Sequence, residues 1–533
     1  MRLAELVRGL DVIEVIGAVD AVDAVDAVGG FSLEITDVCR DHRLCVPGSL
    51  FVCIEGFMSD GHEYIEGAIR NGAVALVVQK NINELKADWE QKANDAIGAD
   101  AGIAASKVGS AVGESAGMDG ITVIRCANTR HALAQLSANF FRHPSQKLKI
   151  AGITGTKGKT TITYMIRSIV QAEGLTSGII GTVENLVGNE RLHSQVTTPE
   201  SYDLQKILSY MVEKGVDIAA VEVSSQGLAL DRASCCDFNI GVFTNLYKDH
   251  ISTNEHSDME DYFSSKLKLF EMCETGLVNT DFNDADRVIK SSRCKMLTFG
   301  IDNDADIMAK NIETVLTNDE LSVSFDLVSP WFSERLKVGL PGRYNVYNAL
   351  AAIGVCSLFG LSPESIAAGL RSVKVRGRVE MVKAGQGFFV LVDYAHNAAS
   401  LESLLEMLRE YKAKRIITVF GCGGDRSKDR RFDMGEVSGR LSDLTIITSD
   451  NPRTEKPLSI IENIEEGIRR TEGDYRKIAD RKEAIQYALK AAEVGDIVVI
   501  AGKGHETTQV FSNRTVHFDD VETAYEILRG MDL

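Results

Sequence analysis

The sequence lacks a long apolar run and any excess of basic residues. No apolar stretch among its 533 residues reaches the roughly 18–20 residues that a membrane-spanning helix needs, so we expect no membrane insertion. Charged residues such as Glu5, Arg8 and Asp11 interrupt the first segment, which leaves no signal-peptide core. The 58 Lys+Arg against 76 Asp+Glu give a net charge of −18. This balance argues against a surface built for nucleic acid or for an anionic membrane.

The sequence also lacks closely spaced cysteine pairs. Its ten cysteines form no C-x-x-C motif and show no metal-binding spacing. In a chain of this length such cysteines are typical of reduced, buried thiols. We therefore expect a cytoplasmic protein.

Length and composition predict a folded protein with several domains. At 44% hydrophobic and 25% charged residues, the chain has an ordinary globular composition. Its length corresponds to about three domains of roughly 150–200 residues. Two low-complexity stretches, 18–28 and 93–118, are interpreted as surface insertions without chemistry. The predicted domains are 1–147, 148–375 and 376–533.

Each predicted domain is of the α/β class. The first combines strand-like runs at 49–56 and 73–79 with helical patterns at 61–72 and 129–145. The central domain opens with a strand, a glycine-rich turn and a helix, which predicts a P-loop-type, mostly parallel sheet. The last domain alternates strands and helices in a Rossmann-like way; its strands are expected at 388–395, 415–421, 444–450 and 496–502.

The strongest local motif is the turn Gly152-Ile-Thr-Gly155-Thr-Lys-Gly158-Lys159-Thr160-Thr161. Glycines let backbone N–H groups surround phosphate oxygens, Lys159 can reach the β- and γ-phosphates, and the Thr160 hydroxyl can hold Mg²⁺. The strict Walker A pattern places its first glycine at position 153, whereas this chain has Gly152. Phosphate binding is still the better interpretation than a plain turn, because the motif lies between a strand and a helix.

Three further residues are candidates for metal or phosphate contacts. Glu222 and His250 each follow a predicted strand, where ligand sites gather in α/β folds. Lys266 lies in a helical pattern, and the residues alone give no reason to prefer it to Lys268. By itself each of these residues is more often structural or solvated.

Four polar loops follow the strands of the last domain. They begin at Asp393, Gly421, Ser449 and Gly502. Four such loops at one sheet edge indicate a single binding surface. Arg453 and Glu506 could hold the carboxylate and the ammonium of an amino acid.

Ten motifs in a fixed order make the chain resemble a known family. They include TGTKGKTT, TTPES, EVSSQGL, DYAHNAASLE, SDNPRTEKP and AGKGHE. This set resembles the Mur ligases, and within them the UDP-N-acetylmuramoyl-tripeptide synthetase branch. The resemblance begins near residue 31 and continues to the end. It departs at Asp41-His42-Arg43, where the family usually reads Asp-Ser-Arg.

The resemblance implies a ligase that uses ATP and Mg²⁺. The γ-phosphate of ATP would activate the D-Glu carboxylate of UDP-N-acetylmuramoyl-L-Ala-D-Glu, and the amine of meso-2,6-diaminopimelate would then displace phosphate. We expect a monomer. Alternatives left open are the same ligation with L-lysine or another diamino acid, a folylpolyglutamate-type synthetase, and a non-catalytic ATP-binding relative.

The resemblance also assigns roles to residues. The ATP site would comprise Gly155, Thr156, Lys157, Gly158, Lys159, Thr160, Thr161, Asn348 near the adenine, Arg378 near the ribose, Asp393 and His396. The UDP-muramoyl-dipeptide would contact His42, Thr197, Thr198, Ser224 and Arg232. Magnesium would be served by Thr160, Glu222, His250 and a carbamylated Lys266, with Lys159, Glu222, His250 and Lys266 as the catalytic set. The acceptor amino acid would lie among Arg426, Asp450, Asn451, Pro452, Arg453, Gly502 and Glu506.

Overall fold

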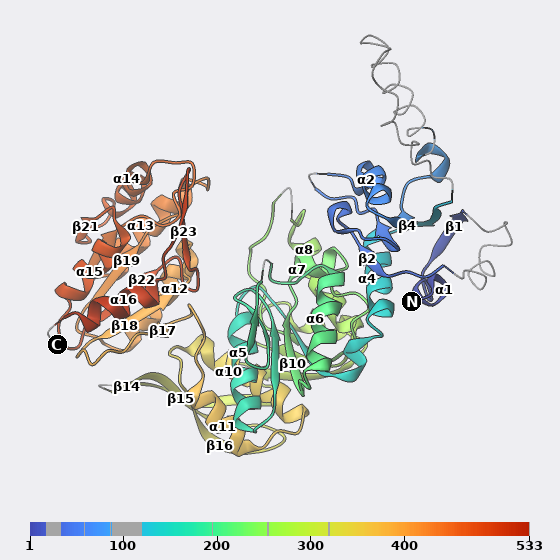
Figure 1. The fold of residues 1–533 in the computed structure, drawn as a ribbon. Helices are drawn as coiled ribbons and strands as arrows, with labels where there is room; N and C mark the ends of the chain where they lie inside the picture. Colours follow the sequence, from blue (N-terminus) through green and yellow to red (C-terminus); the bar gives the residue numbers. More distant parts are fainter. Residues whose placement is uncertain are drawn as a thin grey trace, which may run out of the picture. The chain divides into compact units, whose positions relative to one another are not determined.

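The computed structural model describes residues 1–17, 33–57, 59–85, 87, 120–194, 196–252, 255–317 and 320–531 (Figure 1). The predicted insertions at 18–28 and 93–118 lie entirely outside these ranges. The chain forms two compact units, one of residues 1–156, 176–276 and 287–296, and the other of residues 157–175, 277–286 and 297–533. Within the described ranges, no helix is both long and apolar enough to cross a membrane.

The first unit begins with a five-stranded sheet of order β1-β5-β4-β3-β2. Its central strands are rich in buried Val, Leu and Phe, as expected for parallel strands covered on both faces. Only β1 runs antiparallel to its neighbour. The α/β prediction for this region is confirmed, although the expected helix at 61–72 consists of a 3₁₀ turn at Gly61–Tyr64 followed by α2. The elements are α1 (Leu3–Leu6), β1 (Val12–Ile16), β2 (Asp37–Cys39), β3 (Ser49–Val52), α2 (Ile65–Arg70), β4 (Ala73–Val78), β5 (Thr122–Cys126) and α4 (Thr129–Phe140).

One expectation about the cysteines is wrong. A disulfide joins Cys39 and Cys45, whose Cα atoms lie 6.0 Å apart. The 3₁₀ turn His42–Leu44 reverses the chain between them and brings both within the usual bridging distance. Of the free cysteines, Cys235, Cys273 and Cys294 are partly exposed rather than buried.

The first unit also holds strands of a large, mostly parallel sheet, in the order β12-β11-β6-β10-β7-β8-β9. The strand β6 lies between β10 and β11 and is parallel to both. The carboxyl ends of these three strands therefore meet at one edge, as the central-domain prediction requires. The elements are β6 (Lys149–Thr154), β7 (Ser177–Ile180), β8 (Asn185–Val187), β9 (Glu190–Leu192), α6 (Ser201–Glu213), β10 (Ile218–Glu222), α7 (Ser225–Ala229), β11 (Phe238–Phe243), α8 (Met259–Leu267) and β12 (Cys273–Asn279).

The second unit contains the helix that follows the glycine-rich turn. This helix, α5 (Lys159–Ala172), packs against α10 (Arg343–Leu358) and α11 (Pro363–Ser372). Gly369 of α11 allows the close approach, because a Cβ built there would lie 2.4 Å from the Cα of Ile169. This unit also contains four strands that lie side by side in the order β16-β15-β14-β13. Their bounds are β13 (Lys295–Gly300), β14 (Ile307–Thr317), β15 (Glu320–Val328) and β16 (Ser333–Val338), with α9 (Ala285–Ser291) preceding them in the chain.

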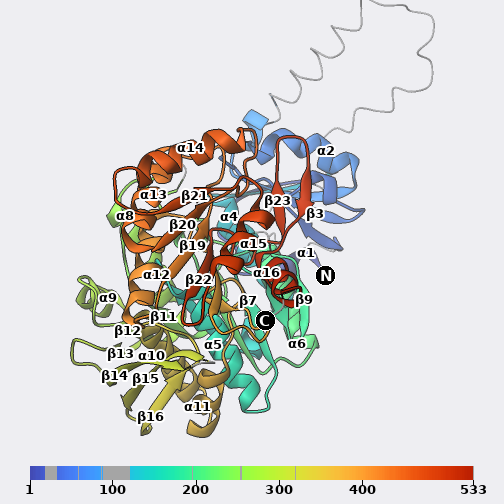
Figure 2. The ribbon, with the colours of Figure 1, turned by 90° about the vertical axis from the view of Figure 1, so that its left-hand side faces the viewer.

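A six-stranded sheet of order β17-β18-β22-β19-β20-β21 completes the second unit (Figure 2). All of its strand pairs are parallel except β17 with β18. The Rossmann-like prediction is confirmed. The elements are β17 (Glu380–Met381), β18 (Phe389–Asp393), α12 (Ala398–Glu410), β19 (Ile416–Phe420), α13 (Asp429–Leu441), β20 (Leu444–Ile447), α14 (Pro457–Ile468), β21 (Tyr475–Lys477), α15 (Arg481–Ala491), β22 (Ile497–Ala501), the hairpin β23 (Thr508–Val510) with β24 (Thr515–His517), and α16 (Asp520–Arg529).

The contact between α11 and α5 predicts the effect of a single methyl group. Gly369→Ala is expected to lower the free energy of unfolding by about 1–3 kcal/mol, since the Cβ would overlap the backbone of Ile169. Urea denaturation checks this value. Gly530→Ala is the matched control, because its Cβ would come no closer than 3.5 Å to the Ile527 carbonyl oxygen. Equal effects of the two substitutions would contradict the packing argument.

Candidate active site

The glycine-rich turn adopts a conformation that requires its glycines. Gly155 follows β6 with φ of +136°, and a Cβ there would lie 1.9 Å from Thr244 Oγ1. Gly158 has φ of +93° and forms the N-cap of α5. Lys159 and Thr160 are thus the first residues of this helix, where free backbone N–H groups favour an anion. The geometry fits a phosphate-binding turn.

Asn348 of α10 lies against this turn. A Cβ at Gly158 would be 2.5 Å from Asn348 Oδ1. The Asn348 side chain is buried and donates through Nδ2 to Asn345 Oδ1 at 3.0 Å. The predicted nucleotide residue is therefore fixed beside the phosphate-binding turn by α10.

Thr156 connects the turn to the helix α8. Its backbone N–H donates to the Asn245 carbonyl at 3.0 Å, and its hydroxyl lies 3.0 Å from Tyr262 Oη. Burial raises the pKa of Tyr262 to about 12, so the phenol keeps its proton and can donate. The polar contact therefore extends from the turn into α8.

The structure separates the two lysines that the residues alone did not distinguish. Lys266 is 1% exposed, and its Nζ lies 4.3 Å from the centre of the Tyr262 ring. Lys268 is exposed and donates to the Leu228 carbonyl oxygen at 3.5 Å. Burying an ammonium is costly unless it is compensated, so the solvated-helix interpretation of Lys266 is wrong.

His250 lies on the loop after β11. It has φ of +59°, and its Nδ1 lies 3.0 Å from Glu255 Oε1. Its ring centre is 5.9 Å from that of Tyr262. His250 is thus placed next to the aromatic residue that also contacts Thr156 and Lys266.

Glu222 ends β10 and is 1% exposed. It accepts hydrogen bonds from the backbone N–H of Thr182 at 3.0 Å and from the Thr182 hydroxyl at 2.9 Å. The same hydroxyl lies 3.0 Å from Thr197 Oγ1. A candidate metal ligand and a candidate substrate threonine therefore share one partner, Thr182, which the sequence analysis missed.

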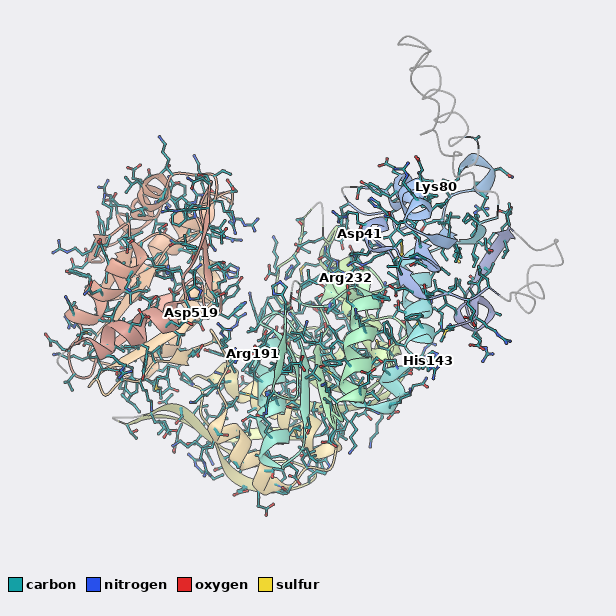
Figure 3. The ribbon with its side chains drawn as sticks, viewed as in Figure 1. Asp41, Lys80, His143, Arg191, Arg232 and Asp519 are labelled. Carbon is teal, nitrogen blue, oxygen red and sulfur yellow. A yellow bond between two sulfur atoms is a disulfide. The ribbon has the colours of Figure 1, made fainter. Side chains whose placement is uncertain are left out.

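The other predicted donor residues form a continuous hydrogen-bonded group. The Thr198 hydroxyl donates to the Glu222 carbonyl at 2.9 Å and lies 3.0 Å from Ser224 Oγ. Arg232 donates to the Thr198 carbonyl at 3.3 Å and pairs with Glu200 at 2.9 Å. Figure 3 labels Arg232 in this part of the first unit. The structure thus brings together Thr197, Thr198, Ser224 and Arg232.

His42 lies elsewhere in the first unit, on the turn closed by the disulfide. Its ring stacks on Tyr64, with centroids 4.9 Å apart and planes 1° from parallel. Gly67 leaves room for the ring, because a Cβ there would be 2.7 Å from His42 Cδ2. The imidazole of His42, which is larger than the serine that the resemblance leads us to expect at this position, is therefore accommodated by stacking on Tyr64.

In the second unit, four side chains surround the end of β18. Tyr394 has the His396 ring at 4.7 Å, the His505 ring at 4.9 Å and the Arg378 guanidinium at 4.9 Å from its ring centre. Burial lowers the pKa of His396, and burial together with Arg378 lowers the pKa of His505 to about 4. Both imidazoles are therefore neutral near pH 7.

Asp393, the last residue of β18, belongs to the same group. It is buried and accepts hydrogen bonds from the backbone N–H groups of Val379 and Ala395, each at 2.8 Å. Burial raises the pKa of Asp393. Tyr394 and His505 had not been assigned a role from the sequence, although both lie within the motifs DYAH and GKGHE.

The loops after β20 and β22 meet through a buried lysine. Lys503 is fully buried, and its Nζ donates to Glu506 Oε2 at 3.1 Å and to Asn451 Oδ1 at 3.2 Å. Asn451 Nδ2 also donates to Glu506 Oε2 at 2.8 Å. The Glu506 carboxylate is thus held in one orientation by two residues of the predicted surface. Lys503 was missed, because a lysine in a glycine-rich loop carries no signal of burial.

Arg426 lies on the loop after β19, and Arg453 lies on the loop after β20 and contacts the first loop. Arg453 has φ of +49° and donates through Nη1 to the Gly424 carbonyl at 2.6 Å. A Cβ at Gly423 would lie 3.0 Å from Arg453 Nη1 and 3.9 Å from Arg426 Cγ. The two cations therefore flank the same glycine. Pro452, which precedes Arg453 in the loop after β20, is buried.

Asp450 and Gly502 lie beneath these side chains. Gly502 has φ of +111°, and a Cβ there would be 3.0 Å from Asp450 Oδ2. Asp450 is buried and accepts from the Asn451 backbone N–H at 2.6 Å. Burial raises the pKa of Asp450. The four predicted loops thus form one surface, as expected from the parallel order of their strands.

A buried ion pair supports two of these loops from below. Arg481 and Asp520 are both fully buried and 2.7 Å apart. Arg481 also donates to the carbonyl of Ala501 at 3.0 Å and approaches that of Ser449 at 3.4 Å. These carbonyls belong to the starts of the two loops that carry Asn451 and Glu506. Sequence analysis missed this pair because its partners are 39 residues apart.

The described residues contain no group of three or more His, Cys, Asp or Glu side chains that could hold a metal ion by themselves. Magnesium rarely uses such a group, because it usually keeps several waters and binds one or two protein ligands plus substrate phosphates. The Thr160 hydroxyl at the start of α5 in the second unit and the buried Glu222 carboxylate at the end of β10 in the first unit are each, taken separately, the kind of ligand that Mg²⁺ accepts. The residues present fit Mg²⁺ that arrives with a nucleotide.

Comparison with known proteins gives matches along the whole chain. Family models match residues 34–141 (Mur ligase family, catalytic domain), 153–356 (Mur ligase middle domain) and 377–504 (Mur ligase, glutamate ligase domain). A protein of Caldanaerobacter subterraneus subsp. tengcongensis named UDP-N-acetylmuramoyl-L-alanyl-D-glutamate--2,6-diaminopimelate ligase is 40% identical over 529 residues, 99% of each chain. A Clostridioides difficile protein of the same name is 38% identical and covers 100% of each chain.

Solved structures match the fold over most of the chain. One described as UDP-N-acetylmuramoyl-L-alanyl-D-glutamate--2,6-diaminopimelate ligase is 27% identical, has a TM-score of 0.64 and covers 93% of this chain and 95% of its own. A MurF structure from Acinetobacter baumannii is 18% identical, has a TM-score of 0.58, covers 93% of this chain and 94% of its own, and shows the fold alone.

The depressed pKa of His505 predicts a pH-dependent stability. An unfolded histidine binds a proton below about pH 6.5, whereas folded His505 does so only near pH 4, so this residue destabilises the fold as pH falls between these values. His505→Asn should therefore reduce the stability lost between pH 7.5 and 5 by about 2 kcal/mol. Amide hydrogen exchange of Ile497–Ala501, corrected for intrinsic rates, measures the free energy of unfolding at each pH.

His517→Asn provides a control of opposite sign. His517 is exposed, and its hydrogen bond with Glu522 raises its pKa. Its contribution to stability is present at low pH and is lost as pH rises, so its removal should increase the loss on acidification. Identical pH profiles for His505→Asn and the unsubstituted protein would show that His505 titrates normally.

Proposed function

Since this chain belongs to the Mur ligase family, we propose that it is an ATP-dependent ligase of peptidoglycan precursor synthesis. The reaction joins 2,6-diaminopimelate to the D-Glu carboxylate of UDP-N-acetylmuramoyl-L-Ala-D-Glu. Relatives that bear the name of this activity are 36–41% identical over at least 93% of the chain. We further propose that the enzyme acts as a cytoplasmic monomer with domains 1–147, 148–375 and 376–533.

The observation that carries this proposal is the polar surface at the carboxyl edge of the C-terminal sheet. There a buried lysine and an asparagine orient Glu506, and Arg453 lies at the adjoining loop. An amino acid offers an ammonium for a carboxylate and a carboxylate for a guanidinium. Diaminopimelate has such a pair at each end, whereas L-lysine has only an amine at its distal end.

The central sheet supplies the activating chemistry. Lys159 at the start of α5 neutralises charge on the transferred phosphoryl group of ATP, while the turn glycines allow backbone N–H groups to approach the phosphates. The resulting acyl phosphate converts an unreactive carboxylate into a substrate for an amine. Thr160, Glu222 and His250 would hold Mg²⁺, which when bound would supply further neutralisation of phosphate charge.

Lys266 is proposed to act as a carbamate. Carbamylation first removes one proton from the Lys266 ammonium. The neutral amine then bonds to CO₂ and loses a second proton, which turns a buried cation into an anion able to bind metal. Support comes from its 1% exposure and its position over the Tyr262 ring, next to His250. An uncarbamylated ammonium at this depth would carry a desolvation cost.

The donor is proposed to bind through the hydrogen-bonded group of Thr197, Thr198, Ser224 and Arg232. The uridine end would lie at His42, whose stacking on Tyr64 presents an imidazole where relatives have a hydroxyl. In the C-terminal domain, Arg378, Asp393 and His396 would face the nucleotide. Asn348 would do so from the central domain.

A panel of acceptors tests the proposed function. Phosphate release from ATP is measured with the UDP-muramoyl-dipeptide and, in turn, meso-2,6-diaminopimelate or L-lysine, and in a separate reaction with a folate and L-glutamate. Release only with diaminopimelate is expected. Preference for L-lysine would support the sibling ligase, use of glutamate on a folate would indicate a folylpolyglutamate-type synthetase, and no release with any acceptor would support a non-catalytic ATP-binding protein.

Lys266→Ala tests the carbamate. Turnover is expected to fall by at least about a hundredfold, because the anionic group at the metal is lost. Short carboxylates such as acetate should restore part of the activity to this variant. Lys268→Ala, two residues further on and exposed, is the control and should keep most activity. Full activity of Lys266→Ala would refute the carbamate.

Arg453→Ala tests acceptor selectivity. We expect kcat/KM for diaminopimelate to exceed that for L-lysine by about a hundredfold or more, because lysine leaves the guanidinium without its carboxylate. Arg453→Ala should reduce that ratio mainly through KM. Arg426→Ala, the exposed neighbour across Gly423, serves as a comparison. If the Arg453→Ala enzyme kept the same preference for diaminopimelate over L-lysine, another residue would be the one that binds the distal carboxylate.

A further inference from the structure

Three sulfur atoms gather in the first unit, away from every residue assigned above. Cys273 begins β12, Cys294 precedes β13, and Met296 lies within β13. The Sγ atoms of Cys273 and Cys294 are 3.6 Å apart, and Cys294 Sγ lies 3.6 Å from Met296 Sδ. Neighbouring strands bring together residues that are separated by about twenty positions in the sequence.

Two glycines leave the space that the sulfur atoms occupy. A Cβ at Gly276 would lie 2.3 Å from Met296 Sδ, and a Cβ at Gly241 would lie 2.9 Å from Cys273 Sγ. Any larger residue at these positions would displace a sulfur atom. The grouping of the three side chains is therefore built into the backbone.

Cys273 and Cys294 border a hollow at the protein surface. Cys273 and Cys294 are both partly exposed, and they line a surface cavity of about 480 Å³ together with Phe270, Glu271 and Arg293. The cavity is large enough to admit a small ion beside the two cysteines. Glu271 contributes a negative charge at the entrance for an arriving cation.

The donor set favours a soft cation. Thiolate and thioether sulfur atoms prefer Cu(I) to harder divalent ions such as Mg²⁺. Metal–sulfur bonds of about 2.3 Å, with a trigonal or tetrahedral angle between them, place two sulfur atoms about 3.7–4.0 Å apart. The observed separations of 3.6 Å are close to this value. A covalent disulfide would require about 2.05 Å.

We propose that Cys273, Cys294 and Met296 form a binding site for one Cu(I) ion. On binding, each thiol releases a proton to solvent as its copper–sulfur bond forms, and Met296 donates a sulfur lone pair. Neither copper nor sulfur changes oxidation state. Arg293 at the cavity offsets the negative charge that the two thiolates bring. The site is independent of the proposed ligase activity.

A competition titration with the full chain tests the site. Because Cys39 and Cys45 form a second cysteine pair when reduced, every variant carries Cys39→Ser and Cys45→Ser. The anaerobic protein is titrated with Cu(I) in the presence of bicinchoninate, whose coloured copper complex reports free Cu(I), and bound copper is counted by mass spectrometry. One tightly bound Cu(I) per chain is expected.

Substitutions then assign the ligands. Cys273→Ser and Cys294→Ser should each weaken binding at least a hundredfold, and Met296→Leu about tenfold, since the thioether is the weaker ligand. Cys235→Ser, another partly exposed cysteine, is the matched control and should leave binding unchanged. Circular dichroism confirms that each variant is folded.

Alkylation of the unsubstituted protein provides a second readout. Bound Cu(I) should protect the peptides that contain Cys273 and Cys294 from N-ethylmaleimide, and should leave labelling of Cys235 unchanged. Retention of the tight site in the Cys273→Ser/Cys294→Ser variant would overturn the proposal. So would the absence of copper binding combined with formation of a Cys273–Cys294 disulfide under mild oxidation, because the pair would then be a redox couple.

Discussion

Parallel strand pairing is the constraint on which the candidate active site depends. A parallel sheet brings the carboxyl ends of its strands to a common edge, and the loops that leave this edge can carry side chains without disturbing the hydrogen-bonded core. In the central sheet this edge holds Glu222 and the turn after β6. In the C-terminal sheet it holds Asp393, Asn451 and Glu506 through the adjacent strands β18, β22, β19 and β20.

Charges buried behind these edges hold the loops in one conformation. Arg481 and Asp520 neutralise each other with no exposure, and the guanidinium uses its remaining N–H groups on carbonyls at the ends of β20 and β22. Removal of either partner would leave an uncompensated charge in the core. Lys503 is also fully buried and has a similar role, because it fixes the carboxylate of Glu506. The side chains that would meet substrate therefore rest on an inner set of fixed charges.

Close backbone approach is the second recurring device. Gly155, Gly158 and Gly369 lie where any Cβ would collide with a neighbour. Gly155 allows the turn to approach Thr244, Gly158 allows it to approach Asn348 of α10, and Gly369 allows α11 to pack against α5. Gly241 and Gly276 use the same device to make room for sulfur atoms. Glycine at these positions thus serves the nucleotide turn in one place and the sulfur cluster in another.

The sequence by itself determined the α/β class, the strand–turn–helix context of the phosphate turn and the four polar loops after the C-terminal strands. These features depend on local periodicity and on short motifs, which can be read along the chain. It also placed Thr197, Thr198, Ser224 and Arg232 in one site, but only through the ordered motifs of a family.

Only the tertiary structure decided what depends on burial and on contacts between distant residues. It distinguished Lys266 from Lys268, revealed Thr182 as the partner of Glu222, and joined Cys39 to Cys45 against expectation. The physical reason is that solvent exposure and pairing partners are set by how strands and helices pack, and this information is spread over residues far apart in the chain. A lysine carries the same letter whether it is solvated or buried against a tyrosine ring.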